Sequence, residues 1–290
     1  MNRCPAVPSK QQGVALLLVL WACTLLAILL GGYAALARTE ALQARYTFAE
    51  AQAHYAAEAG VMQAIYGLQD PIAKQRWVGD GRTYTIHYDH ATVAIGAVDE
   101  AGKVDLNAAA PDVLTGLFRA AGLGQTKAQM LADHVVDWRN PIGLPGQGDR
   151  QRSQYLAAGR DYGPRHGPFA SVEELQMVLG MTPGLYRQVA PVVTIWAGAG
   201  SPDPNTAPAL ALAAIPGMTP AQQQKIEAAR LRNADDSMLV INNGTTHSIR
   251  SEATLADGTH AIVRATVRLQ TGQADAQPYT VLRWQEGSAE

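Results

Sequence analysis

The stretch Gly13–Ala37, GVALLLVLWACTLLAILLGGYAALA, decides the fold of this chain. A short polar leader with two basic residues precedes it, and the run after the glycine meets no charge until Arg38. An ordinary secretory signal carries its cleavage site after the apolar stretch. Here the glycine comes before that stretch. We therefore expect a cut between Gly13 and Val14, which leaves the apolar run in the mature protein.

The apolar run is long enough to cross a bilayer, because about 20 apolar residues suffice at 1.5 Å per residue. We assign residues 14–37 to a transmembrane helix. Arg3 and Lys10 lie before this segment, which favours an N-terminus in the cytoplasm and the bulk of the chain on the other side. On hydropathy alone, a plain N-terminal membrane anchor explains the run equally well.

Residues 38–70 continue as a helix without proline, and Asp70-Pro71 marks its expected end. Apolar residues recur there every three or four positions, which is typical of an amphipathic helix. The predicted apolar positions are Leu42, Tyr46, Ala49, Ala53, Ala56, Gly60 and Ala64. The sequence therefore predicts one helix of more than fifty residues that leads from the membrane into a folded region.

Composition sets few limits beyond these. The 290 residues carry a formal net charge of −2, so the whole chain has no attraction to nucleic acid or to anionic lipid. The two cysteines, Cys4 and Cys23, lie in the leader and in the apolar run. Neither can form a disulfide within a soluble domain, so a packed core or a metal ion must hold that domain together.

Two regions of alternating polar and apolar residues predict one sheet. Residues 82–107 read as two or three strands with a turn at Glu100–Gly102, and residues 247–270 and 279–286 alternate in the same way around an Asp257-Gly258 hairpin turn. More than a hundred helix-like residues separate the two regions. We therefore expect an α+β fold in which the N-terminal helix packs on an antiparallel sheet formed by residues 71–106 and 236–290. A helical insert at 107–235 interrupts this sheet.

The insert contains repeats. Three segments, 114–135, 175–193 and 210–229, share the order of helix, glycine-containing turn and second helix, and Gly180–Pro183 and Gly217–Pro220 both read GMTP. Threonine is expected to cap the second helix and proline to occupy its first turn. Asn107 and Asn205 are expected to cap further helices. The pattern predicts helix-hairpin-helix (SAM-like) units.

Helix-hairpin-helix units often hold DNA phosphates, which requires surplus positive charge. Residues 107–232 carry eleven basic and nine acidic residues, and neither GMTP turn holds a basic residue. This balance disfavours nucleic acid as a partner and favours a structural or protein-contact role for the insert.

The leader that ends in Gly13, the retained apolar run and its amphipathic continuation resemble the type IV pilin and type II secretion pseudopilin superfamily. The resemblance implies that a prepilin peptidase cuts after Gly13 and methylates Val14. Most members have glutamate at the fifth mature position, where this chain has Leu18. Absence of that glutamate, the AEAG segment at 57–60 and the split sheet resemble the minor pseudopilins of the K type.

That resemblance implies a single-pass protein of the bacterial inner membrane with its C-terminal domain in the periplasm. Its implied partners are the I-type and J-type minor pseudopilins, other pseudopilins, the prepilin peptidase and the inner-membrane secretion platform. With the first two it would cap the pseudopilus, prime its assembly and support export of folded proteins. A subunit with Leu18 lacks the carboxylate that contacts the neighbouring subunit ahead of it. The resemblance therefore implies a position at the tip of the pseudopilus, where no such neighbour exists.

The resemblance also implies a calcium site in an acidic loop between Asp137 and Phe169. Calcium requires six to eight oxygen ligands. The candidate ligands here are Asp137, Asp149, Asp161 and Glu173, whereas Arg139-Asn140-Pro141 replaces the usual acidic cluster. A weak site and an ordinary surface loop both remain open.

Enzymatic function has no support in the sequence, which lacks the HExxH, GxSxG and GxxxxGK[ST] motifs. His134 and Asp137 lie one helical turn apart but have no nucleophile context. Two other functions stay open as alternatives. One is a minor pilin of a type IV pilus or DNA-uptake system with a nucleic-acid- or adhesin-binding tip, and the other is a membrane-anchored periplasmic enzyme.

Overall fold

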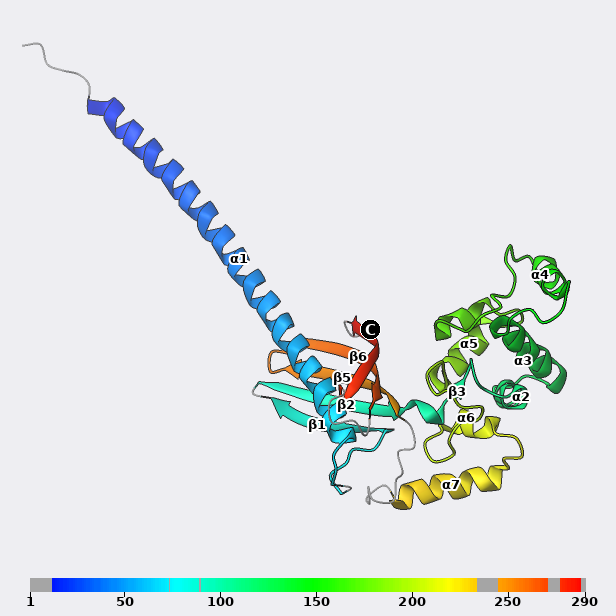
Figure 1. Ribbon diagram of the computed structural model, residues 1–290. Helices are drawn as coiled ribbons and strands as arrows, with labels where there is room; N and C mark the ends of the chain where they lie inside the picture. Colours follow the sequence, from blue (N-terminus) through cyan, green and yellow to red (C-terminus); the bar gives the residue numbers. More distant parts are fainter. Residues whose placement is uncertain (1–11, 73, 89, 234–244, 271–276, 288–290) are drawn as a thin grey trace, which may run out of the picture. The chain divides into compact units, whose positions relative to one another are not determined.

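Helix α1 (Gln12–Leu68) is continuous over 57 residues, which confirms the predicted single helix (Figure 1). The computed structural model describes residues 12–72, 74–88, 90–233, 245–270 and 277–287, so most of the predicted leader lies outside the described residues. The chain divides into two compact units, Met1–Gln52 and Ala53–Glu290. In the first unit, the helix side chains from Val14 to Phe48 are all exposed. Because apolar side chains avoid water, this segment requires another apolar environment.

Five antiparallel strands form the sheet of the second unit, in the order β1-β2-β5-β6-β7. Their bounds are β1 (Asp80–Tyr88), β2 (Ala91–Asp99), β5 (Thr246–Leu255), β6 (His260–Leu269) and β7 (Tyr279–Gly287). Strand β2 pairs directly with β5, although the insert separates them in sequence. The prediction of an α+β fold with an antiparallel sheet is confirmed.

The second half of α1 packs across one face of this sheet (Figure 1). Its buried positions include Ala53, Ala57, Val61 and Ala64. A Cβ atom added at Gly60 would lie 2.2 Å from the Ser251 Oγ and 2.8 Å from the Val93 Cγ1, so glycine permits the close approach of helix and sheet.

The predicted apolar face of α1 was therefore partly wrong. Ala56 is only half-buried, whereas Ala57, one residue later, is fully buried. Leu42 and Tyr46 are exposed. Ala53, Gly60 and Ala64 are buried as predicted, so in the part of the helix that packs on the strands the predicted face was right except at Ala56.

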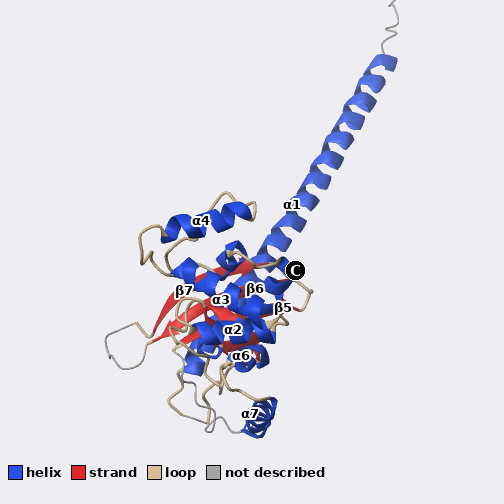
Figure 2. Ribbon diagram, turned by 90° about the vertical axis from the view of Figure 1, so that its right-hand side faces the viewer, coloured by secondary structure: helices blue, strands red, loops and turns tan. Residues whose placement is uncertain are grey.

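The insert between β2 and β5 is helical. It contains α2 (Pro111–Ala120), α3 (Gln125–Arg139), α4 (Gln147–Ala157), α5 (Pro183–Val189), α6 (Ala209–Ala214) and α7 (Pro220–Asn233). Three short 3-10 turns, η1 (Glu100–Gly102), η2 (Val172–Met177) and η3 (Ala190–Val192), complete the helical elements. Helices α4 and α7 lie at opposite margins of the insert in both views (Figures 1 and 2).

Two short strands, β3 (Val104–Asp105) and β4 (Val193–Thr194), form a parallel pair within the insert. Around them lies one apolar core that includes Leu114, Phe118 and Trp138, together with Leu212 from the third repeat. Helix α2 packs against α3 and α6. The first and third repeats therefore share a core, while their assignment to the helix-hairpin-helix class stays a prediction.

The threonine caps predicted for the two GMTP turns are present. The Thr182 hydroxyl accepts a hydrogen bond from the Leu185 amide at the start of α5. The Thr219 hydroxyl accepts one from the Gln222 amide, and the Gln222 Oε1 accepts one from the Thr219 amide. This reciprocal pair is a capping box at the start of α7.

The caps predicted for the two asparagines were wrong. Helices α2 and α6 begin later, after Ala110 and Pro208. The aspartates two residues before the asparagines form turns instead. The Asp105 Oδ1 accepts a hydrogen bond from the Asn107 amide, and the Asp203 Oδ1 accepts one from the Asn205 amide. The two segments do form the same local structure, but in each of them the aspartate, not the asparagine, accepts the hydrogen bond that fixes the turn.

Candidate functional site

The N-terminal candidates lie on α1 in the first unit. Gly13 and Val14 belong to the first helical turn, and the Val14 and Leu18 side chains are 65% and 66% exposed. Within the described residues, one helix, which starts at Val14, is long and apolar enough to cross a membrane, and none of its most apolar window is buried. These facts are consistent with a single-pass anchor. Cleavage, methylation and orientation stay predictions.

The four calcium candidates lie on separate elements. Asp137 is near the end of α3, Asp149 is on α4, Asp161 follows α4, and Glu173 is on η2. The Glu173 Oε1 accepts a hydrogen bond from the Arg283 Nη2 of β7 at 3.2 Å. Glu174, the next residue, pairs with Arg165 instead. Among the residues that the structure describes, no three of these four carboxylates lie within 4.8 Å of one another.

A different set of ligand-type side chains lies close together. In the part of the chain that the structure describes, the one group of three or more His, Cys, Asp or Glu side chains within 4.8 Å of one another is His54, Glu58 and Glu286. The His54 Nε2 lies 3.6 Å from the Glu58 Oε1 and 3.9 Å from the Glu286 Oε1. The group includes none of the four calcium candidates.

The loop predicted between Asp137 and Phe169 is more ordered than expected, because it contains α4. The buried Tyr155 of α4 lies 6.4 Å, between ring centroids, from Trp138, and its hydroxyl accepts a hydrogen bond from the Leu179 amide. Burial raises the pKa of Tyr155 above its ordinary value. These contacts join α4 to the core of the insert.

A polar clamp, which sequence reasoning missed, joins the start of the insert to Arg139 and to Gly198. The Asp105 Oδ2 accepts a hydrogen bond from the Gly198 amide at 2.6 Å. Arg139 donates to the Leu106 and Ala109 carbonyl oxygens at 2.9 and 2.7 Å. Burial lowers the pKa of Arg139, although the nearby Asp105 opposes this effect. Only the D-x-N repeat in the sequence could have indicated the clamp.

A second buried polar group lies where β2 ends. Asp99 pairs in register with His247 of β5, and both are buried, as is Glu100. Burial lowers the pKa of His247, while Asp99 and Glu100 act in the opposite direction. The Lys103 Nζ donates a hydrogen bond to the Glu100 Oε1 at 2.6 Å.

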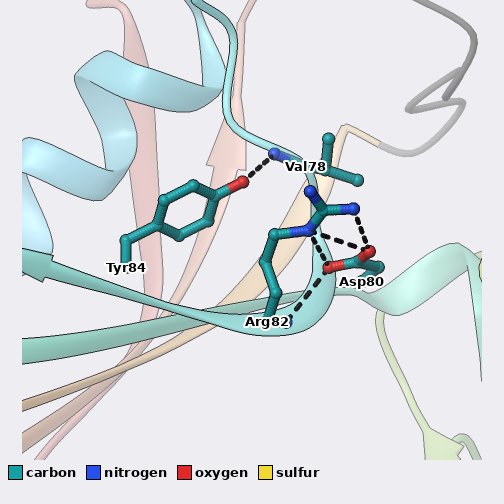
Figure 3. Close-up of polar contacts among 4 residues, drawn as sticks. All are labelled: Val78, Asp80, Arg82 and Tyr84. Carbon is teal, nitrogen blue, oxygen red and sulfur yellow. Dashed lines mark hydrogen bonds and ion pairs between the residues drawn. The ribbon is translucent and has the colours of Figure 1, made fainter. Parts of the chain in front are cut away.

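The connection from α1 to β1 is fixed by the contacts in Figure 3. In Figure 3 the Tyr84 hydroxyl accepts a hydrogen bond from the Val78 amide. The Tyr84 ring also stacks on Trp77, which the figure does not draw, with ring centroids 4.0 Å apart. Arg82 forms an ion pair with Asp80 at 2.7 Å. Burial raises the pKa of Asp80, but the hydrogen bonds and charge of Arg82 outweigh it and hold this pKa below its ordinary value. These contacts orient the first strand.

His134, which lies one helical turn before Asp137, contacts the backbone of another segment. Its Nδ1 lies 2.8 Å from the Leu179 carbonyl oxygen, which fixes the ring against the chain that follows η2. His134 thus has a structural contact that its sequence position did not indicate.

Comparisons with known proteins give a family match over part of the chain and similar solved structures. Residues 94–198 match the family described as type II secretion system (T2SS), protein K. No curated protein matches the chain. Among solved structures, one chain of the GspK-GspI-GspJ complex from the enterotoxigenic Escherichia coli type 2 secretion system has a similar fold. The two share 16% sequence identity with a TM-score of 0.57, and the match covers 85% of this chain and 100% of the other.

The family match is confined to residues 94–198, whereas the structural match shows a similar fold over most of the chain. Over residues 94–198 the family match supports the similarity to the minor pseudopilins of the K type. The resemblance drawn from the sequence is thereby confirmed.

Proposed function

We propose that this chain is the minor pseudopilin at the tip of a type II secretion pseudopilus, where it primes assembly and supports export of folded proteins across the outer membrane. The observation that carries this proposal is Leu18, an apolar residue on α1 at the fifth position after the predicted cut. A carboxylate within a bilayer is costly unless it has a partner. A subunit without that carboxylate does not require a neighbour ahead of it.

We infer that the I-type and J-type minor pseudopilins are its direct partners, because the solved chain with a similar fold belongs to a GspK-GspI-GspJ complex. The exposed side chains of α1 supply an apolar surface for helix–helix contacts with them. The prepilin peptidase, the other pseudopilins and the inner-membrane platform are the further expected partners.

The helical insert supports a position at the tip. It adds a folded mass with its own apolar core to a helix-on-sheet domain. Such a mass would obstruct another subunit from stacking above this one. Its role in this proposal is structural rather than enzymatic.

Mass spectrometry of the N-terminus, with and without prepilin peptidase, tests the processing step. We expect a mature chain that begins with methylated Val14 only when the peptidase is present. A mature chain that starts at Met1, or beyond Ala37, would refute the proposal and favour a plain anchor.

Capture of I-type and J-type pseudopilins by the tagged full-length chain tests the position in the assembly. We expect both partners in stoichiometric amounts. Salt-dependent binding of DNA in place of these partners would indicate the pilus or DNA-uptake alternative.

Calcium binding at Asp137, Asp149, Asp161 and Glu173 stays a proposal. Titration with calcium should raise the melting temperature of the full-length chain, and Asp149→Asn should remove the effect. Asp112→Asn, outside the candidate set, is the control. An unchanged melting temperature would mean that this segment is an ordinary surface loop.

A further inference from the structure

The face of the sheet that points away from α1 carries a groove. Val93 and Ser251 lie against the helix, and alternate residues of a strand point to opposite faces, so Gly96 and Arg250 belong to the other face. The groove there has a volume of about 590 Å³ and is lined from β1 at one edge to β7 at the other. That volume is in the range of ligand sites in proteins.

Positive side chains dominate the charged lining. Lys103, Arg250, Arg264 and Arg283 line the groove, with Glu252 as the one carboxylate of the lining. Arg250 pairs directly with Arg264 across β5 and β6. Like charges directly opposite each other destabilise a sheet, so this pair is a local cost that a bound anion would remove.

Three of these cations already have carboxylate partners. Arg250 pairs with Glu252 at 2.8 Å, Arg283 with Glu173 at 3.2 Å, and Lys103 with Glu100 at 2.6 Å. Arg264 has no ion pair with any residue that the structure describes. The four cations of the lining and their three partner carboxylates therefore have a net charge of +1, and Arg264 is the cation without a carboxylate partner among the described residues.

The shape of the groove favours a narrow, extended occupant. Ala94 and Gly96 are small, and a Cβ atom added at Gly96 would lie no closer than 3.9 Å to its neighbours, so the floor at this point is open. Five strands at about 4.8 Å apart make the groove roughly 19 Å long, which is about six residues of extended peptide. The Thr83 hydroxyl lines it and can bond to a peptide backbone, whereas the Ser248 and Thr266 hydroxyls, which also line it, bond to each other at 3.2 Å.

We propose that this groove binds an extended acidic peptide segment, about six residues long, of a partner protein. A carboxylate of that segment pairs with Arg264, and its backbone crosses the open floor at Gly96. This interaction does not depend on the tip position, because it uses only the sheet of the second unit.

Fluorescence anisotropy with the full-length chain in detergent micelles tests the groove. The probe is a labelled heptapeptide in which glutamate alternates with serine, and its counterpart has glutamine in place of glutamate. We expect the acidic peptide to bind at least about tenfold more tightly than the glutamine peptide. Arg264→Glu should weaken its binding at least about tenfold, whereas Arg187→Glu, at an exposed position on α5, should not change it.

A second variant tests the groove by its shape. Gly96→Leu fills the floor without meeting a close neighbour, so it should keep the fold, as circular dichroism would verify, and weaken binding by a similar factor. This variant decides the question if Arg264→Glu does not fold. The proposal is overturned if the acidic peptide does not bind, if binding survives Gly96→Leu, or if a DNA oligonucleotide of equal charge competes equally well.

Discussion

At the scale of single residues, His247 is buried with neither ring nitrogen hydrogen-bonded to a described residue. Burial lowers its pKa below the ordinary value of 6.5, because Asp99 and Glu100 only partly offset the loss of solvent. Above pH 6.5 the ring is neutral in both folded and unfolded chains. Below pH 6.5 the unfolded chain takes up a proton first. We therefore expect the free energy of unfolding to fall as the pH falls, by up to about 1.4 kcal/mol per pH unit.

Urea unfolding between pH 7.5 and 5 measures this effect. His247→Met should flatten the curve below pH 6.5, because the unfolded chain then has no extra site for that proton. His260→Gln, at an exposed position, is the matched control. An equal slope in wild type and His247→Met would contradict the assignment.

Gly60 gives a second prediction at this scale. Gly60→Ala places a methyl group 2.2 Å from the Ser251 Oγ, so α1 or β5 must shift. Overpacking of this kind costs about 1–3 kcal/mol of stability. Thermal unfolding should show the loss, and a second change, Ser251→Gly, should recover part of it. Gly184→Ala, which meets nothing within 4 Å, should not destabilise; if it costs as much, the close contact is not the cause.

Single residues also show where sequence reasoning stopped. The hairpin at Asp257-Gly258 was predictable because its turn chemistry is local, and Gly258 has a φ of +88°. Asn107 was assigned as a cap, but its side-chain amide donates to the Phe169 carbonyl oxygen, 62 residues away. No local pattern can indicate a partner at that distance.

At the scale of elements, the start of α5 depends on the Thr182 cap. Thr182→Ala removes the acceptor of the Leu185 amide, and loss of such a cap typically costs about 1 kcal/mol. Urea unfolding should show this loss, whereas Thr182→Ser, which keeps the hydroxyl, should remain near wild type. A serine variant as unstable as the alanine variant would mean that the methyl group matters more than the cap.

Helix α4 is the element that the sequence did not predict. Its segment QGDRQRSQYLA has few apolar residues, so its periodicity is weak. Contacts from elsewhere stabilise it, above all the packing of Tyr155 near Trp138 and the bond of its hydroxyl to Leu179. Asp149, one of the candidate calcium ligands, therefore lies on α4 rather than in an open loop.

At the scale of the whole molecule, Leu18→Glu tests the proposed position at the tip. A tip subunit has no neighbour ahead to pair with the new carboxylate, whose burial in a bilayer costs about 2.5–3.5 kcal/mol. We expect lower recovery of the complex with I-type and J-type partners and less exported protein in the medium. Leu18→Ile is the control. Unchanged export with the variant found along the filament shaft would contradict the proposal.

The overall architecture was the most predictable level. The apolar run, the alternating strands and the GMTP turns are patterns within short windows, and each indicated the element that forms. The order of the strands depended on the idea of an insertion, which the direct pairing of β2 with β5 bears out. The full clamp at Asp105 and Arg139 could not be predicted, because its bonds join residues that are 33 and 93 positions apart in the sequence.

These contacts within the insert have a consequence for the order of folding. The pairing of Asp99 with His247 closes a loop of about 150 residues, and the entropy lost in closing a loop grows with its length. Once the insert has folded, the β3–β4 pair and the Asp105–Gly198 hydrogen bond hold together two segments that are 93 residues apart in the sequence, so the loop that remains to be closed is shorter. We therefore expect the insert to fold first and then to act as a template that brings β5 to β2. The β2–β5 pair in the sheet then forms late, and its formation depends on an insert that contributes no strand to that sheet.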